Sequence, residues 1–137
     1  MNGSLYDRIG GREGIATLLG HFYADVRQHG LIGPIFNQQI RDWPAHLGRI
    51  GEFWARITGG PSVYSGQMPA KHFGLGLDAK DFGAWLQLWE CNCRCYCEPR
   101  EAQEMTELAR EIGRRLRSIL SGHPATGALN FAAVGPP

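Results

Sequence analysis

Several features that would assign this chain to a membrane or to a nucleic acid are missing from its sequence. No uninterrupted apolar run is long enough to span a bilayer. The formal net charge of the 137 residues is only +1, which argues against a general electrostatic attraction to nucleic acid or to an anionic membrane surface. The N-terminus, MNGSLYDRIGG, has no basic stretch followed by an apolar one, so no secretory signal is expected. These absences predict a cytoplasmic protein, in which stable disulfides are not the default.

Internal repeats and the alternating pattern of β-strands are also absent, and apolar residues recur at helical spacing instead. The composition, 43% hydrophobic and 20% charged, is typical of a globular domain with a sizeable core. We therefore predict an all-α fold in one domain over residues 1–121. The Gly-, Pro- and Ala-rich residues 122–137 are expected to form a loose tail.

Capping residues, glycine terminators and apolar stripes divide the chain into helices. The predicted helices are a short one after Ser4, residues 12–28, residues 42–58, a helix that begins at Asp78, and residues 99–121. Gly33-Pro34 predicts a turn that delivers Phe36 inward. The helix that begins at Asp78 is expected to bury one face, made of Phe82, Trp85, Leu86 and Trp89.

A further, very short helix is predicted in PAKHFGLGL, residues 69–77, and it carries a lone histidine, His72. Pro69 suits a first helical turn, whereas Gly74 and Gly76 are poor helix formers that end the helix soon. A histidine alone is more often a surface residue or a paired core residue than a metal ligand. On a short turn flanked by glycines, however, it can approach a large planar ligand from one side.

Three polar side chains lie on apolar helix faces: Tyr23, His46 and Trp85. Each one alone is best explained as a core residue whose polar tip is paired with backbone or water, because buried polar groups are normally hydrogen-bonded. Together, however, they come from three different helices and can close over the second side of the same ligand. Imidazole is a good ligand for haem iron, and phenol, imidazole and indole can donate hydrogen bonds to a bound diatomic molecule.

Seven short stretches now point to a known family. They are LYDRIGG, HFYADV, GPIF, WPAHLGRIGEFW, YSGQ, KHFGL and FGAWLQLWE. In this order and near this spacing, they resemble the truncated haemoglobins, whose fold is a two-over-two helical sandwich. GPIF together with WPAHLGRIGEFW favours the third group of that family. The resemblance covers about residues 4–121.

The resemblance implies haem b as cofactor and assigns roles on its two sides. His72 matches the proximal histidine that ligates the iron. Tyr23 matches the distal tyrosine that bonds the ligand, His46 the distal-helix position beside the iron's open site, and Trp85 the tryptophan that closes the distal pocket. The further haem contacts that it implies are Phe36 against the haem face, Ile50, Phe53 and Trp54 along the distal wall, and Tyr64, Lys71 and Arg49 near the haem edge and propionates. A solvated side chain is an equally good explanation for Arg49.

The function that the resemblance implies is binding of dioxygen, nitric oxide, carbon monoxide, cyanide or peroxide at a His-ligated iron. Three distal donors would retain the ligand tightly, which suits chemistry better than transport. Oxygen–nitric oxide chemistry or peroxidase-like turnover would need an external reductase. The alternative is a haem-based sensor or carrier without turnover, so enzymatic activity stays an open question. A monomer or weak dimer is expected.

The family resemblance does not explain the run ECNCRCYCE, residues 90–98, in which every second residue from Cys91 to Cys97 is a cysteine. The spacing is not the paired pattern of a zinc knuckle. In a helix, Cys91 and Cys95 share one face, and Cys93 and Cys97 share another. The simplest interpretation is that the four cysteines are small apolar residues that are tolerated near a helix end. A redox role, an intermolecular disulfide or soft-metal capture are the alternatives, and an extended chain would place all four on one side. A haem-free protein that works through these cysteines is the third hypothesis.

Overall fold

The computed structural model describes residues 3–64 and 78–120, excluding the side chains of residues 116–120. Its helices are α1 (Leu5–Arg8), α2 (Gly11–Gln28), α3 (Gly33–Gln39), α4 (Trp43–Ile57), α5 (Ala79–Tyr96) and α6 (Pro99–Leu120). No strand occurs within these ranges, and the predicted all-α fold is confirmed. The predicted helical turn around His72, Lys71 and the predicted tail lie outside the described residues.

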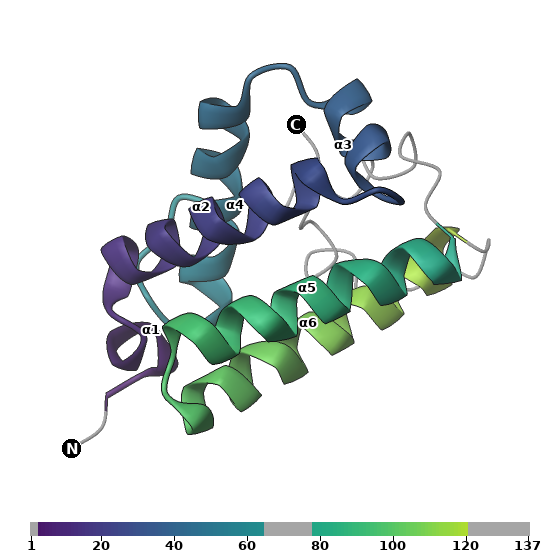
Figure 1. Ribbon diagram of the computed structural model, residues 1–137. Coiled ribbons are helices and arrows are strands. Elements are labelled where there is room, and N and C mark those ends of the chain that lie inside the picture. The colour runs from purple at the N-terminus through teal and green to yellow at the C-terminus, as the bar shows by residue number, and fades with distance from the viewer. Residues whose placement is uncertain (1–2, 65–77, 121–137) are drawn as a thin grey trace.

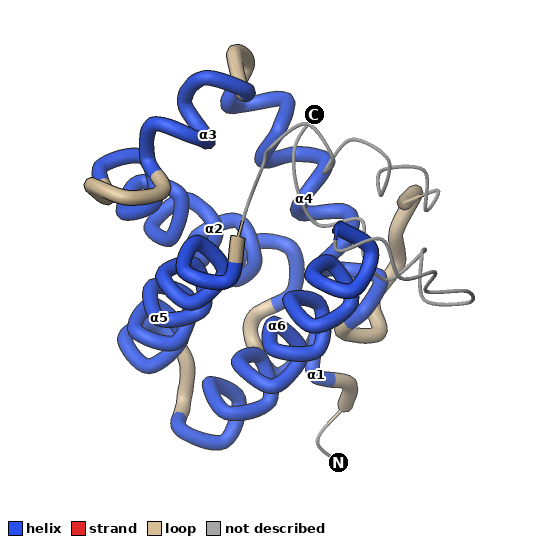
Figure 2. The backbone as a smooth tube through the Cα atoms, turned by 90° about the vertical axis from the view of Figure 1, so that its right-hand side faces the viewer, coloured by secondary structure: helices blue, strands red, loops and turns tan. Residues whose placement is uncertain are grey.

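The long helices form two layers of two (Figure 1). In one layer α2 crosses α4, and in the other α5 and α6 run side by side and antiparallel, joined by a short turn at Cys97 and Glu98. α2 also packs on α5, so it connects the two layers. The view turned by 90° shows α5 and α6 as neighbours again, with α3 at the opposite end of the molecule (Figure 2).

Local capping residues fix where the helices begin. The Ser4 hydroxyl accepts a hydrogen bond from the backbone N–H of Asp7, and the Asp42 carboxylate accepts one from that of Ala45. At the start of α5, Asp78 and Asp81 each accept from the other's backbone N–H, both at 3.0 Å, and form a capping box. The three caps expected at these sites are therefore present.

The segment that begins with Gly33-Pro34 corrects the sequence prediction, because it forms the helix α3 rather than a simple turn. Proline is favoured in the first turn of a helix, where its missing N–H costs no hydrogen bond. Gly33 allows this start to approach the end of α2 closely, since a Cβ atom there would lie 2.8 Å from the Arg27 carbonyl oxygen. Phe36 is buried, as predicted.

A group of aromatic rings connects all four long helices at the centre of the molecule. The indoles of Trp54 in α4 and Trp89 in α5 are stacked, with 4.6 Å between ring centroids and 17° between planes. Phe22 of α2 meets Trp89 edge-on at 4.8 Å. The indole N–H of Trp89 donates to the Met105 carbonyl of α6 at 3.0 Å. Leu86, which was expected to be buried with Trp89, is only partly buried.

Replacing Trp89 by Phe is expected to lower the free energy of unfolding by about 2–3 kcal/mol, because it removes a buried hydrogen bond and leaves space in the core. Guanidinium unfolding followed by far-UV circular dichroism measures this change. Tyr96→Phe, on the exposed side of the same helix, is the control and should change the value by less than about 0.5 kcal/mol. Equal destabilisation of the two variants would contradict the central role of the Trp89 indole.

Candidate functional site

Three helices bring Tyr23, His46 and Trp85 together, as the sequence predicted for these polar side chains. Tyr23 of α2, His46 of α4 and Trp85 of α5 are 2%, 0% and 6% exposed. The rings of Tyr23 and His46 meet edge-on with centroids 5.5 Å apart. The Trp85 indole lies near enough to Tyr23 to act on its phenol and to lower its pKa against the larger effect of burial. One buried cluster thus contains a phenol, an imidazole and an indole.

The position of His46 follows from the local sequence of α4. Asp42 caps this helix and Pro44 lies in its first turn, so His46 lies within its first two turns. Ile50 and Phe53, four and seven residues further along, are both fully buried. His46 therefore lies on the buried face of the helix.

Arg49 of the same helix, which was predicted to lie near the haem edge and propionates, is exposed.

The environment of Tyr23 keeps its phenol protonated. Burial raises the pKa of Tyr23 well above its ordinary value, although Trp85 acts in the opposite direction. The O–H group is therefore retained throughout the neutral pH range. A neutral phenol is a hydrogen-bond donor, whereas a phenolate can only accept.

Trp43 is a member of this cluster that the sequence analysis did not assign to the site. Its ring centroid lies 5.7 Å from that of Tyr23 and 5.4 Å from that of His46. The Arg27 guanidinium carbon lies 4.7 Å from the Trp43 ring centroid, in a cation–π contact. The available signal was its spacing, since residues three apart on a helix are neighbours on its surface. Trp43 and Phe36, whose ring lies 6.2 Å from Tyr23, surround the phenol with aromatic rings.

The other residues that were predicted to contact haem differ in where the structure places them. Ile50, Phe53 and Trp54 are buried in the core along α4. Tyr64 is 8% exposed, its ring packs edge-on against Phe53 at 5.3 Å, and burial raises its pKa to about 12. Lys71 and His72, the predicted iron ligand, lie outside the described residues.

The cysteine run is helical, because α5 continues to Tyr96. Cys91 and Cys95 are exposed, Cys93 is buried and Cys97 is half-buried, so the interpretation with all four on one side is wrong. Burial raises the pKa of both the Cys93 and the Cys97 thiol. In the part of the chain that the structure describes, no group of three or more His, Cys, Asp or Glu side chains could hold a metal ion.

The run also contains a polar contact that its spacing did not predict. Asn92 is buried, and its amide donates to the Asp25 carboxylate of α2 at 3.0 Å and to the Leu88 carbonyl at 2.9 Å. Asn92 therefore ties α5 to α2 one turn beyond Trp89.

Within residues 3–64 and 78–120, no helix is long and apolar enough to cross a membrane.

The two-layer helical sandwich, with a buried Tyr, His and Trp between α2, α4 and α5, defines the class as a truncated globin. The chain belongs to the bacterial-like globin family, whose model matches residues 4–112. Globins normally bind haem and small diatomic ligands. The resemblance to truncated haemoglobins seen in the sequence is therefore confirmed.

The individual relatives are truncated haemoglobins of group 3 and of group 1. The chain is 39% identical to group 3 truncated hemoglobin ctb of Campylobacter jejuni over 84 residues, which cover 58% of this chain and 66% of that protein. It is 33% identical over 81 residues to group 1 truncated hemoglobin GlbN of Mycolicibacterium paratuberculosis, covering 58% of each. The aligned segments thus span less than two thirds of each of these relatives, 66% of the first and 58% of the second. The crystal structure of group III truncated hemoglobin from Campylobacter jejuni superposes with a TM-score of 0.74 at 31% identity, covering 84% of this chain and 94% of that one.

The difference in burial predicts two classes of thiol. Cys91 and Cys95 should react quickly with Ellman's reagent at pH 8, whereas Cys93 should react only after unfolding, because it is buried and its pKa is raised. Cys97 should react at an intermediate rate. Thiolate release followed at 412 nm measures these phases, and Cys93→Ser is the control that leaves the fast phase intact. A fast phase that persists in the Cys91→Ser/Cys95→Ser double variant would contradict the assignment.

Proposed function

We propose that this globin is a haem b protein that binds dioxygen and related diatomic ligands, with His72 as the axial ligand of the iron. The observation that carries the proposal is the convergence of Tyr23, His46 and Trp85 from three helices in one buried cluster. A set of buried hydrogen-bond donors beside aromatic rings is the chemistry that a haem-bound diatomic ligand requires. When bound, haem would supply an iron atom whose open position accepts such a ligand.

The distal side chains would hold the ligand through hydrogen bonds. Tyr23 keeps its O–H at neutral pH and is the principal donor. Trp85, which acts on the phenol, would orient Tyr23, and His46, whose ring meets that of Tyr23 edge-on, would offer a second donor. Phe36 and Trp43 would exclude bulk water from the cluster, which strengthens these hydrogen bonds.

The remaining haem contacts that we propose are those that the family resemblance implies. The proposed distal wall consists of Ile50, Phe53 and Trp54. The proposed contacts to the haem edge and propionates are Tyr64, Arg49 and Lys71, since cationic side chains complement carboxylates. We expect a cytoplasmic protein that is a monomer or weak dimer.

Several distal donors favour slow ligand release, which suits reaction more than transport. We propose oxygen–nitric oxide chemistry or peroxidase-like reduction, with electrons from an external reductase. Rapid oxygen release together with no turnover in the presence of reductant would favour the carrier or sensor function instead.

Absorption spectra test the cofactor and its axial ligand together. The purified protein should show a strong Soret band in the ferric, dithionite-reduced and carbon monoxide-bound states. His72→Ala should lose haem or give an altered five-coordinate spectrum, because the imidazole ligand is removed. His21→Ala, an exposed histidine stacked on Tyr96, is the matched control and should keep the spectrum unchanged. A protein that stays colourless after haem is added would refute the proposed function.

Stopped-flow measurement of oxygen release tests the distal donors. Tyr23→Phe should accelerate release roughly 10- to 100-fold, because a hydrogen bond to a charged group contributes about 1.5–3 kcal/mol. Tyr96→Phe, which removes an exposed phenol from α5, serves as the control. Equal release rates in the two variants would show that Tyr23 does not bond the ligand.

A further inference from the structure

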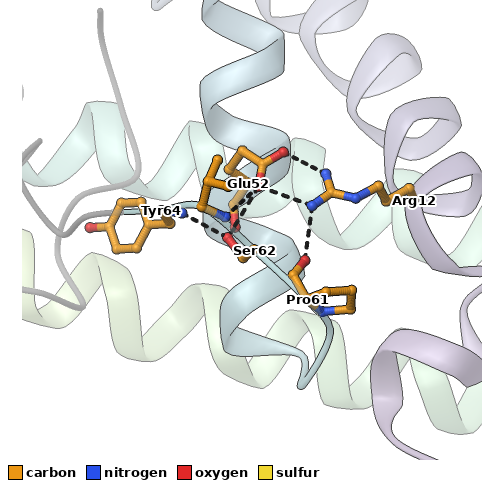
Figure 3. Close-up of polar contacts among 6 residues, drawn as sticks. Arg12, Glu52, Pro61, Ser62 and Tyr64 are labelled. Carbon is orange, nitrogen blue, oxygen red and sulfur yellow. Dashed lines mark hydrogen bonds and ion pairs between the residues drawn. The ribbon is translucent and has the colours of Figure 1, made fainter.

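The carboxylate of Glu52 in α4 holds the residues that follow this helix (Figure 3). The Arg12 guanidinium of α2 donates to its two oxygens at 2.5 and 3.0 Å. The backbone N–H of Val63 donates to the same carboxylate at 2.9 Å, and the Ser62 hydroxyl approaches it at 3.3 Å. Arg12 also donates to the Pro61 carbonyl at 2.9 Å. One ion pair between α2 and α4 therefore binds the loop after α4.

Ser62 extends this network along the loop. Its hydroxyl donates to the Glu52 backbone carbonyl at 2.6 Å and accepts from the Tyr64 backbone N–H at 3.0 Å. The Arg56 guanidinium donates to the Tyr64 carbonyl at 3.2 Å. The backbone of residues 61–64 is thus bonded to side chains rather than to a helix or sheet, which fixes an otherwise irregular segment.

The charges of the pair persist over the neutral pH range. The Arg12 hydrogen bonds, together with the bond from Val63, lower the pKa of Glu52 to about 2, and Glu52 raises the pKa of Arg12. The Arg12 and Glu52 side chains are 47% and 24% exposed, and a partly exposed pair contributes little to global stability. Its effect is therefore expected to be local, on the loop that it holds.

The place of this loop in the chain suggests what it does. Residues 65–77, which carry His72, begin directly after Tyr64 and end at Asp78, where the capping box with Asp81 fixes the start of α5. The described residues directly before and directly after that segment are thus held by carboxylates. Anchored ends reduce the conformational freedom that must be lost when a side chain within the segment binds a ligand.

We propose that Glu52, held by Arg12, is a positioning residue for the axial histidine of haem. Glu52 acts through Ser62 and Val63 and does not touch the cofactor. This inference rests on the proposed function, because it takes His72 as the iron ligand. It assigns to an ion pair of α2 and α4 an influence on the side of haem opposite to the Tyr23 cluster.

Haem transfer from the holoprotein to excess apomyoglobin tests this proposal. Glu52→Ala should accelerate haem loss roughly 10-fold, near the lower end of what groups behind a metal ligand contribute to affinity. Ser62→Ala should also accelerate it, because it cuts the network beyond the intact Arg12–Glu52 pair. Glu52→Gln, which keeps an acceptor for Val63, should show a smaller effect. The control is Glu90→Ala, which breaks partly exposed ion pairs with Arg94 and Arg110 and should leave the rate within about twofold.

A spectroscopic signature separates positioning from a general loss of stability. In the ferrous, ligand-free state, the iron–histidine stretching band in the resonance Raman spectrum should shift or broaden in Glu52→Ala and Ser62→Ala, and not in Glu90→Ala. If Glu52→Ala and Ser62→Ala both leave the rate of haem loss and the position of the band unchanged, the positioning role is overturned. If Glu52→Ala does not fold, Ser62→Ala and Glu52→Gln decide the question in the same way. A wild-type protein that binds no haem would instead overturn the proposed function, and this inference with it.

Discussion

The stacking of Trp54 on Trp89 is the contact on which the rest of the molecule depends. It fixes the separation of the two layers, and Phe22 and the Met105 carbonyl extend it to α2 and α6. Tyr23, His46 and Trp85 are each on the same helix as one member of this group. Tyr23 directly follows Phe22, Trp85 precedes Trp89 by about one turn, and His46 precedes Trp54 by about two turns. The apolar stack therefore sets the distance and orientation of the polar cluster.

The core and the cluster use aromatic side chains in different ways. In the core, the indole N–H of Trp89 is bonded to the backbone, and the stacked ring faces of Trp54 and Trp89 are apolar. In the cluster, Tyr23, His46 and Trp85 concentrate polar groups in a region from which water is largely excluded. Burial there strengthens hydrogen bonds and keeps the Tyr23 phenol neutral. A chain that needed only stability could have filled these positions with apolar residues.

The parts of the structure that the sequence predicted are those that local chemistry controls. Asp42 and Asp78 act within three residues of themselves, and the apolar stripe of α4 repeats within one helix, so both were visible in the sequence. The helix α3 was missed because Gly-Pro is equally compatible with a turn and with a helix start. Contacts such as Arg12–Glu52 and Asn92–Asp25 join residues that are far apart in the sequence. They could not be predicted, because a surface carboxylate has many potential partners until the helices are packed. Trp43 lies three residues before His46 on the same helix, but its contact with Tyr23 and Arg27 of α2 becomes visible only when the two helices are packed.

The two sides of the proposed haem site are constrained by different means. Tyr23, His46 and Trp85 lie on long helices whose positions the core fixes, and sites built on helices hold their geometry more accurately than sites built on loops. The described residues that precede and follow the segment with His72 in the sequence are instead held by the Glu52 network and the Asp78–Asp81 capping box. Changes in the core should therefore alter the distal donors first, whereas changes in the surface carboxylates should alter the axial side first. On the proposed function, surface charge would in this way tune one side of the site with little effect on the packing that holds the other.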